Sequence, residues 1–215
     1  MKTFFSLIHI APEAAPIFIV VLCIAVIAAF LWRKSLFITF IFIGSLLFFF
    51  RDPVREFSGD PTAILAPADG TVADIAEVTL PQYPGVSFVR IGIFLSLLNV
   101  HVQRVPCDGV VESIAHRKGS CLLAFSEEAR KKNRAVLTLM KTEEGIVAVQ
   151  QLTGLIARRI INNLSAGQTV HRGERLGIIC FGSRVELYLP KGTPVSVAVG
   201  EAVRGGETIV AGWEK

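Results

Sequence analysis

The chain has 215 residues, of which 52% are hydrophobic, and a formal net charge of +4 at pH 7. This length is typical of one domain, or of one domain with an appendage. The composition is too apolar for an ordinary soluble domain, and the positive charge is too weak and too dispersed to predict a nucleic-acid partner.

The N-terminal segment contains two uncharged apolar runs, 16–32 and 35–50, which only Arg33 and Lys34 separate. Each run lies at the lower limit of the length that a helix needs to cross a bilayer, about 20 residues. A cleaved signal peptide is a poor fit, because the first run leads into a second one. A buried core hairpin is the alternative, but both runs are apolar all round. We therefore predict a membrane-associated helical hairpin, spanning or re-entrant, over residues 1–50.

Residues 51–215 are predicted to form one β-rich domain. Short apolar or alternating runs are interrupted by Gly and Pro, which is typical of strands and turns. The stretch 86–105 is long and β-rich, and strands are expected at 135–140, 146–152, 176–180, 184–189 and 195–199. One short helix is expected near 126–133, because acidic residues open this segment and basic residues close it.

An eight-residue pattern occurs twice near the C-terminus. The pattern Gly-x-x-Val-x-x-Gly-Glu spans 167–174 and again 200–207. It is similar to the hammerhead turns of lipoyl- and biotinyl-type barrel sandwiches. The repeat supports a mostly β (α+β) fold with a barrel-sandwich-like domain, and it says nothing about function.

Four cysteines occur at positions 23, 107, 121 and 180, without a C-x-x-C pair. This spacing favours reduced, buried thiols over disulfides. For the same reason no metal site is expected.

The bond between Gly182 and Ser183 is the first candidate for chemistry. It lies between the apolar run 176–180 and the alternating segment 184–190. Glycine has no Cβ and leaves its carbonyl open to attack. Attack by the Ser183 hydroxyl would convert the amide into an ester, and elimination of that ester would cut the chain and leave an N-terminal pyruvoyl group. Gly-Ser also occurs elsewhere in the chain, where such a pair is usually only a turn.

Three further places could take part in chemistry, and each has a plainer alternative. Asp69 lies in an Asp-Gly pair that opens a strand, and such a pair is usually only a turn signal. His101 lies in an apolar strand, where a lone histidine is more often a core residue. Arg158 and Arg159 could bind phosphate or carboxylate in a bidentate manner, or form a plain surface pair.

Taken in their order along the chain, these segments resemble the phosphatidylserine decarboxylase family in its short bacterial or archaeal form. The resemblance covers nearly the whole length and includes the hydrophobic hairpin. Its motifs are Phe-Phe-Phe-Arg-Asp-Pro at 48–53, Pro-Ala-Asp-Gly at 67–70, Asn-Val-His at 99–101, the segment 154–160 and Phe-Gly-Ser-Arg-Val at 181–185.

The resemblance implies a pyruvoyl-dependent carboxy-lyase that is made as a proenzyme. Self-cleavage between Gly182 and Ser183 would give a large chain, 1–182, and a small chain, 183–215. The first residue of the small chain would become the pyruvoyl cofactor. The mature enzyme would convert phosphatidylserine to phosphatidylethanolamine.

The resemblance also implies roles for single residues. Ser183, His101 and Asp69 are the catalytic candidates, and Arg158 and Arg159 are weaker candidates for binding the phosphodiester or the carboxylate of the substrate. Longer family members carry a second histidine three residues after the first, and Arg104 occupies that place here. The base for self-cleavage is therefore either His101 or Asp69.

The expected partners follow from the same reading. They are a phospholipid substrate, the membrane, and the two cleavage fragments as a heterodimer that could assemble further. We expect a location at the cell membrane with the catalytic domain on the cytoplasmic face. Two other functions are compatible with parts of the sequence: a non-enzymatic adaptor with a barrel-sandwich domain on a membrane anchor, and a pyruvoyl decarboxylase of another amino acid or serine lipid.

Overall fold

The computed structural model describes residues 10–31, 35–120, 127–154, 159–180 and 183–214. The chain divides into two compact units, Met1–Val54 and Arg55–Lys215. The first unit contains a 3-10 helix, η1 (Pro12–Ala14), and two helices, α2 (Ala15–Leu31) and α3 (Ser35–Phe49).

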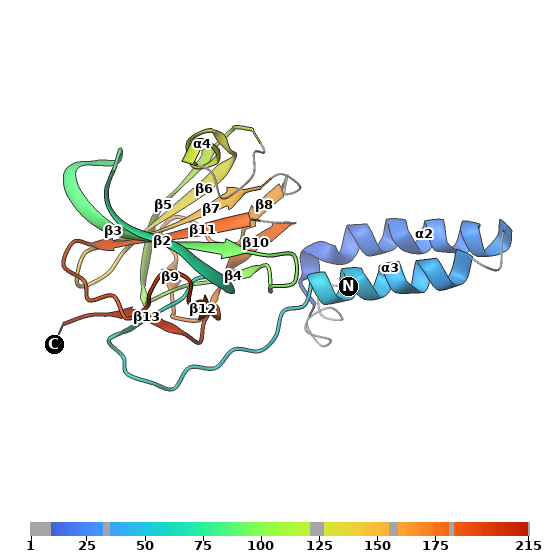
Figure 1. Cartoon of the computed structure of the whole chain (residues 1–215), viewed down its shortest axis with the longest axis horizontal. Helices are drawn as coiled ribbons and strands as arrows, with labels where there is room; N and C mark the ends of the chain where they lie inside the picture. Colours follow the sequence, from blue (N-terminus) through green and yellow to red (C-terminus); the bar gives the residue numbers. More distant parts are fainter. Residues whose placement is uncertain (1–9, 32–34, 121–126, 155–158, 181–182, 215) are drawn as a thin grey trace. The chain divides into compact units, whose positions relative to one another are not determined.

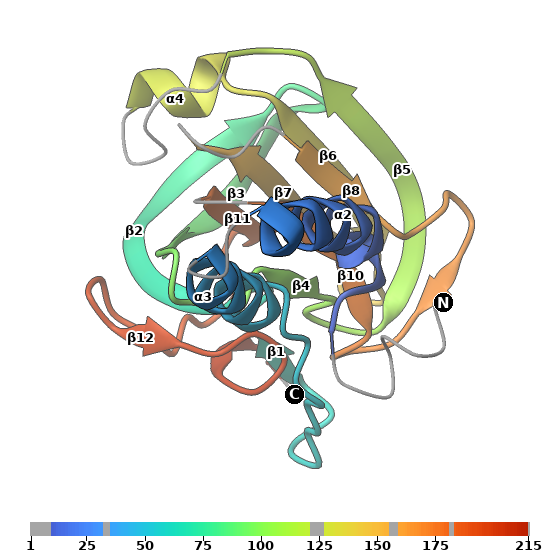
Figure 2. The same ribbon diagram turned by 90° about the vertical axis from the view of Figure 1, so that its right-hand side faces the viewer.

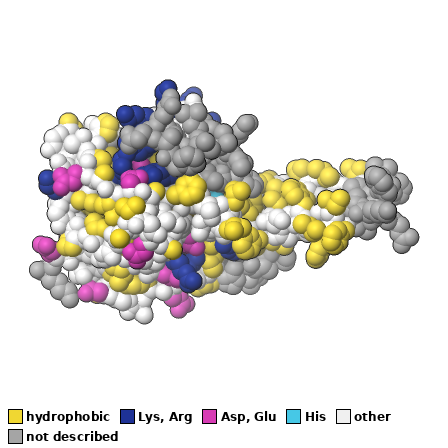
Figure 3. All heavy atoms as spheres, viewed as in Figure 1, with side chains coloured by type: hydrophobic (Ala, Val, Ile, Leu, Met, Phe, Trp, Pro, Cys, Tyr) yellow, Lys and Arg dark blue, Asp and Glu magenta, His cyan; other side chains and the backbone are white. Residues whose placement is uncertain are grey.

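Helices α2 and α3 form a hairpin, as the two apolar runs predicted (Figure 1). Its open end is fixed by the backbone N–H of Ala11, which donates to the carbonyl of Phe50 at 2.7 Å. Apolar side chains cover much of the hairpin surface (Figure 3), and Phe37 and Phe40 are 72% and 77% exposed. No helix in the described residues is both long enough and apolar enough to cross a membrane.

The second unit is built mainly from strands and the turns that connect them. Its one described helix is α4 (Glu127–Lys132), which confirms the short helix that the charge pattern predicted. The strands are β1 (Ala63–Leu65), β2 (Gly70–Leu80), β3 (Tyr83–Leu95), β4 (Val102–Arg104), β5 (Gly109–Arg117), β6 (Ala135–Lys141), β7 (Ile146–Thr153), β8 (Arg159–Asn162), β9 (Thr169–Val170), β10 (Arg175–Cys180), β11 (Ser183–Pro190), β12 (Ala202–Val203) and β13 (Ile209–Gly212).

Eight of these strands form one antiparallel sheet in the order β12-β2-β3-β11-β7-β6-β5-β9. The sheet curls, with β2 at one side and β5 at the other (Figure 2). Two smaller sheets, β4-β10-β8 and β1-β13, complete the unit. Inward-facing apolar residues of all three sheets form the main core, among them Ile93, Val149, Ile179 and Val185. The predicted fold class, mostly β with a barrel-sandwich-like domain and a helical hairpin, is confirmed.

The repeated pattern forms two equivalent turns at opposite edges of the large sheet. Strand β9 follows the turn glycine of the first copy and pairs with β5, while β12 follows that of the second copy and pairs with β2. The second glycine of each copy, Gly173 or Gly206, has a positive φ, of 81° and 76°. Glycine adopts this conformation without the strain that a Cβ would add. The two copies of the repeat therefore provide the two edge strands of the large sheet, β9 and β12.

The β-rich stretch 86–105 contains most of β3 and all of β4, whereas the strand prediction at 195–199 was wrong. The segment 86–105 is interrupted because the Asn99 side chain accepts hydrogen bonds from the Ser96 amide and hydroxyl, at 2.8 and 2.7 Å, and so forms a turn between β3 and β4. The segment 195–199 forms only an isolated bridge between Val195 and Ala211, because the chain turns again at 198–201.

The cysteine prediction is confirmed for two positions. Cys107 and Cys180 are buried free thiols, and burial raises the pKa of Cys107 to about 12. A thiol with so high a pKa stays protonated and unreactive at neutral pH. Cys23 is exposed on α2, contrary to the prediction, since that helix carries apolar side chains on its outer surface. Cys121 lies outside the described residues.

Candidate active site

Ser183 is the first residue of β11, near the middle of the large sheet. It lies opposite Leu95 of β3 on one side and opposite Thr153 of β7 on the other. Its exposed fraction is 0%, and its Oγ has no hydrogen-bond partner among the described residues. Buried polar atoms are nearly always paired, so an orphaned hydroxyl calls for a functional explanation. Gly182, on the other side of the predicted cleavage bond, lies outside the described residues.

His101 is also fully buried, immediately before β4. Its ring Nδ1 lies 2.9 Å from the Asn99 carbonyl oxygen. A carbonyl can only accept a hydrogen bond, so Nδ1 carries a proton, and in the neutral form of the ring Nε2 is the nitrogen with the lone pair. The carbonyl of His101 accepts a hydrogen bond from the Ile179 amide at 3.2 Å. Ile179 precedes Ser183 by four positions, which places His101 beside the strand that leads to the cleavage bond.

Asp69 occupies a different environment from His101. Its carboxylate pairs with Arg55, at 3.0 Å, and accepts a hydrogen bond from the Gly205 amide, at 2.8 Å. Arg55 also pairs with Glu207 at 2.8 Å, so Asp69 belongs to a small cluster beside the second repeat turn. His101 is not among the hydrogen-bond partners of Asp69.

The position of the missing second histidine is close to the same turn. The backbone N–H of Arg104 donates to the Pro67 carbonyl at 2.9 Å. A Cβ added at Gly206 would lie 3.3 Å from the Arg104 side chain. Arg104 therefore packs beside the cluster that contains Asp69.

One of the two arginines predicted to bind substrate lies in a strand. Arg159 is the first residue of β8, lies opposite Cys180 in the small sheet, and is exposed. Arg158 lies outside the described residues.

A chain of buried amides connects His101 to the large sheet. Gln103 donates to the His101 carbonyl at 2.6 Å, and Gln151 of β7 donates to the Gln103 side-chain oxygen at 2.8 Å. Asn162 of β8 donates to the Gln151 side-chain oxygen at 3.3 Å. These residues were not predicted from the sequence. In the sequence, each is a polar residue in a strand that also contains apolar residues. Only the register of the paired strands shows that the three side-chain amides contact one another.

A second polar network lies on the opposite face of β11 from Ser183. Arg184 donates to Glu186 at 2.9 Å and to Asp74, while Arg90 donates to Asp74 at 2.7 Å and Tyr188 donates to Glu186 at 2.6 Å. Burial alone would raise the pKa of Asp74, but the hydrogen bonds and charges of Arg184 and Arg90 outweigh it and hold the pKa below its usual value. The network fixes the strand that Ser183 begins, and it too was missed.

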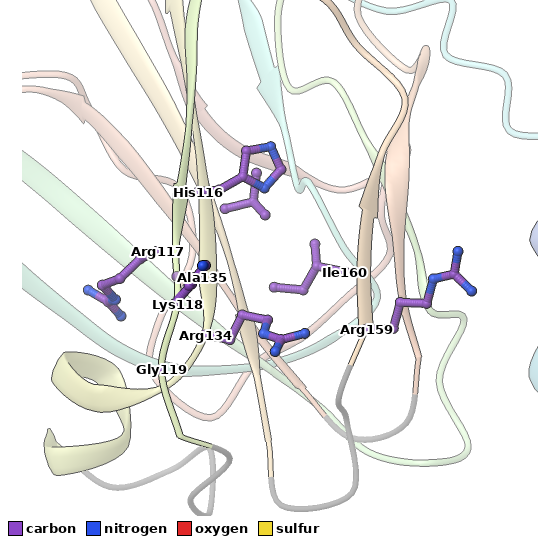
Figure 4. Close-up of a pocket in the computed structure, with 9 residues that line it drawn as sticks. His116, Arg117, Lys118, Gly119, Arg134, Ala135, Arg159 and Ile160 are labelled. Carbon is purple, nitrogen blue, oxygen red and sulfur yellow. The ribbon is translucent and has the colours of Figure 1, made fainter.

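A cavity of about 410 Å³ opens between the end of the large sheet and β8 (Figure 4). Five basic residues line it: His116, Arg117, Lys118, Arg134 and Arg159. No carboxylate of the described residues lines it. The cavity is therefore suited to an anion.

Comparison with known proteins shows similarity to one family. The model of the phosphatidylserine decarboxylase family matches residues 43–211. The chain is 41% identical to a phosphatidylserine decarboxylase proenzyme of Wolbachia sp. subsp. Brugia malayi (strain TRS), over 98% of this chain and 94% of that protein. It is 42% identical to the proenzyme of the same name from Ehrlichia chaffeensis (strain ATCC CRL-10679 / Arkansas), over 96% of this chain and 93% of that protein.

A further relative comes from a different bacterium. The chain is 41% identical to the phosphatidylserine decarboxylase proenzyme of Desulfotalea psychrophila (strain LSv54 / DSM 12343), over 80% of this chain and 83% of that protein. These matches confirm the resemblance that the motifs indicated. The chain belongs to the phosphatidylserine decarboxylase family.

Proposed function

We propose that this chain is a proenzyme that cuts itself between Gly182 and Ser183 and then decarboxylates phosphatidylserine to phosphatidylethanolamine. Membership of a decarboxylase family supports the reaction. The relatives are named proenzymes, which fits a chain that is processed before it acts. On this reading the products of cleavage are a large chain, 1–182, and a small chain, 183–215, that remain together as a heterodimer.

The observation that carries the proposal is the buried Ser183 hydroxyl. It has no hydrogen-bond partner among the described residues, so no such bond has to be broken before it attacks. The backbone of Ser183 is fixed by strands on both sides. A nucleophile held in place beside its target gains rate because little orientational freedom remains to be lost.

We assign the proton transfers to His101. Its Nδ1 hydrogen bond leaves Nε2 as the nitrogen that can accept a proton. In self-cleavage it would take the hydroxyl proton of Ser183, since an unassisted alcohol is a poor nucleophile. In turnover the same nitrogen would deliver a proton to the substrate carbon that has lost carbon dioxide.

Asp69 is assigned a supporting role. Its carboxylate would have to leave Arg55 and the Gly205 amide before it could move a proton elsewhere. In the pair it fixes the start of β2, which adjoins β3 and so supports the strand next to Ser183. His101 is for that reason our first choice for the base of self-cleavage.

The position of Ser183 fits a pyruvoyl group. Such a group is small and uncharged, so its burial at the start of β11 carries no cost of desolvating a charge. It would supply an electron sink for the amine of the substrate. The strands that hold Ser183 would hold the group in the same place.

The exposed apolar hairpin supports attachment to a membrane. A lipid with two acyl chains stays in its bilayer, so its decarboxylase has to work at the bilayer surface. Exposed apolar surfaces as extensive as that of α2 and α3 mark binding sites for membranes or proteins. We propose that the hairpin binds the cell membrane and that the catalytic domain lies on its cytoplasmic face.

The test is the intact mass of the purified protein together with its lipid product. We expect two fragments that meet between residues 182 and 183, and formation of phosphatidylethanolamine from phosphatidylserine. Ser183→Ala should remain one chain and form no product, because no hydroxyl is left to attack. Ser120→Ala, at another Gly-Ser pair, is the matched control and should be cut normally. Fragments from Ser183→Ala would contradict the proposal.

A further inference from the structure

The basic cavity beside β8 has a mixed lining. Its floor contains the buried side chains of Ala135 and Val136 and the half-buried Ile160. Its rim contains cationic side chains from three segments: the end of β5, the start of β6 and the start of β8. Arg117 is held in place there, since its guanidinium donates to the carbonyls of Asn133 and Arg130, at 3.1 and 2.6 Å.

The strand register places this cavity close to Ser183. Ser183 lies opposite Thr153, and the Thr153 amide donates to the Arg134 carbonyl at 3.0 Å. Neighbouring strands lie about 4.8 Å apart, so the backbone of Arg134 lies about 10 Å from that of Ser183. An arginine side chain is long enough to cover much of that distance.

The side chains of Ser183 and Arg134 lie on the same face of the large sheet. Ser183 shares its face of β11 with Val185, a residue of the main core. Arg134 immediately precedes β6, two positions before Val136, which lines the cavity and lies opposite Gln151 on the core-facing side. Figure 4 shows Arg134 and His116 directed towards Ile160, while Arg117 and Arg159 point to either side. Arg134 is therefore the cavity arginine that lies across the sheet from Ser183, with Thr153 between them.

We propose that this cavity binds the phosphodiester of the substrate headgroup, with Arg134 as its main contact and Lys118 and His116 as supporting donors. The inference rests on the proposed function. Guanidinium groups bind phosphate oxygens through two parallel hydrogen bonds, and the described residues that line the cavity include several cations and no carboxylate. Arg159, at the outer rim, has the weaker role of attracting the anion.

The chemistry of the headgroup fits this placement. In phosphatidylserine, one oxygen and two carbon atoms separate the phosphorus from the amine nitrogen. With the amine at residue 183, the phosphate has to lie within one side-chain length of that residue. The cavity that begins two strands away provides cationic groups at such a distance.

The first experiment measures turnover of a short-chain phosphatidylserine by Arg134→Gln. Removing a hydrogen bond to a charged group should raise KM about 10- to 100-fold, with kcat changed far less. Arg134→Lys should recover part of the loss, and Lys118→Gln should show a smaller increase. Lys141→Gln removes one positive charge from the other end of β6 and should behave as wild type. Self-cleavage should be normal in all four variants, which also shows that they fold.

The second experiment measures binding without turnover. Glycerophosphoserine is titrated by calorimetry into uncut Ser183→Ala protein, with and without Arg134→Gln, and we expect an increase in Kd of about 10- to 100-fold. Inorganic phosphate is titrated in parallel. An equal KM and an equal Kd in Arg134→Gln and its parent would overturn the inference, and so would loss of inorganic phosphate binding alone, since the cavity would then hold a free anion. Wild-type protein that makes no phosphatidylethanolamine would instead overturn the proposed function, while the binding measurement still decides on the cavity.

Discussion

A buried hydroxyl that lacks a hydrogen bond costs about 1–3 kcal/mol of folding free energy. Ser183 is such a residue among those described, since its side chain is fully buried and its Oγ has no hydrogen-bond partner there. Proteins store strain of this size at sites where it serves a reaction. At the scale of single residues, the uncut chain therefore has an energetic reason to react at this position.

His101→Ala should slow self-cleavage, because the Ser183 hydroxyl loses its base. General acid–base assistance is worth roughly 100- to 10,000-fold, so cleavage would take hours to days and can be followed on gels. His101→Gln keeps most of the buried volume and serves to separate loss of the base from loss of packing. Asp69→Asn should be cut faster than either variant. Cleavage of His101→Ala at the wild-type rate would show that another group takes the proton.

Asp74 should make the stability of the protein depend on pH in the acid range. Its pKa in the folded state lies below the ordinary value of 3.8, so folding favours the ionised form. The stabilisation is therefore complete above that ordinary value and is lost as the pH falls through the folded value. Denaturant unfolding between pH 6 and pH 2.5 should show this loss in wild type and in the exposed-site control Glu143→Gln. In Asp74→Asn this component should be missing, and an unchanged acid profile would contradict the assignment.

At the scale of elements, the two repeat turns have the same backbone but different surroundings. At Gly173 no atom of the described residues lies within 4 Å of the place where a Cβ would be, whereas at Gly206 that place lies 3.3 and 3.4 Å from the side chains of Arg104 and Arg55. Both glycines have a positive φ. The pair therefore allows backbone strain to be separated from side-chain crowding.

Gly173→Ala should lower the free energy of unfolding by about 1–2 kcal/mol, which is the cost of placing an L-residue in the left-handed region. Gly206→Ala should lower it further, because the Arg104 side chain, 3.3 Å from the new Cβ, must also shift. It would shift beside Arg55, which pairs with Asp69 and Glu207. Both variants can be compared by denaturant unfolding. Equal losses would mean that the crowding at Gly206 relaxes freely.

The elements were predicted well where a short segment determines its own structure. The helices of the hairpin, the charge-bounded α4 and the apolar strands β6, β7, β10 and β11 follow from local pattern. The Gly182-Ser183 pair and His101 were predicted from motifs, and their roles stay predictions. The polar networks were not predicted, because they depend on pairing between distant segments: Arg184 and Asp74 are 110 positions apart. The basic cavity was not predicted for the same reason, since its cationic residues come from three segments that are distant in the sequence.

At the scale of the whole molecule, the hairpin and the β unit are separate compact units. Deleting residues 1–54 should leave a domain that still cuts itself, because Ser183 and His101 both lie in the second unit. Activity on phosphatidylserine vesicles should fall much more than activity on a dispersed short-chain substrate. Equal losses on both substrates would show that the hairpin supports the fold instead of binding the bilayer.

Strand β11 pairs on both sides, with β3 and with β7, and it begins at the residue that would become a new chain end. If residues 183–215 were a separate peptide, β11 would have to insert between β3 and β7 of another chain. An uncut precursor avoids this step, because β11 is still joined to β10. Cleavage therefore has to come after the sheet has formed. Cleavage thus depends on correct folding. A chain in which β11 is not paired with β3 and β7 does not position Ser183, and so does not form the active enzyme.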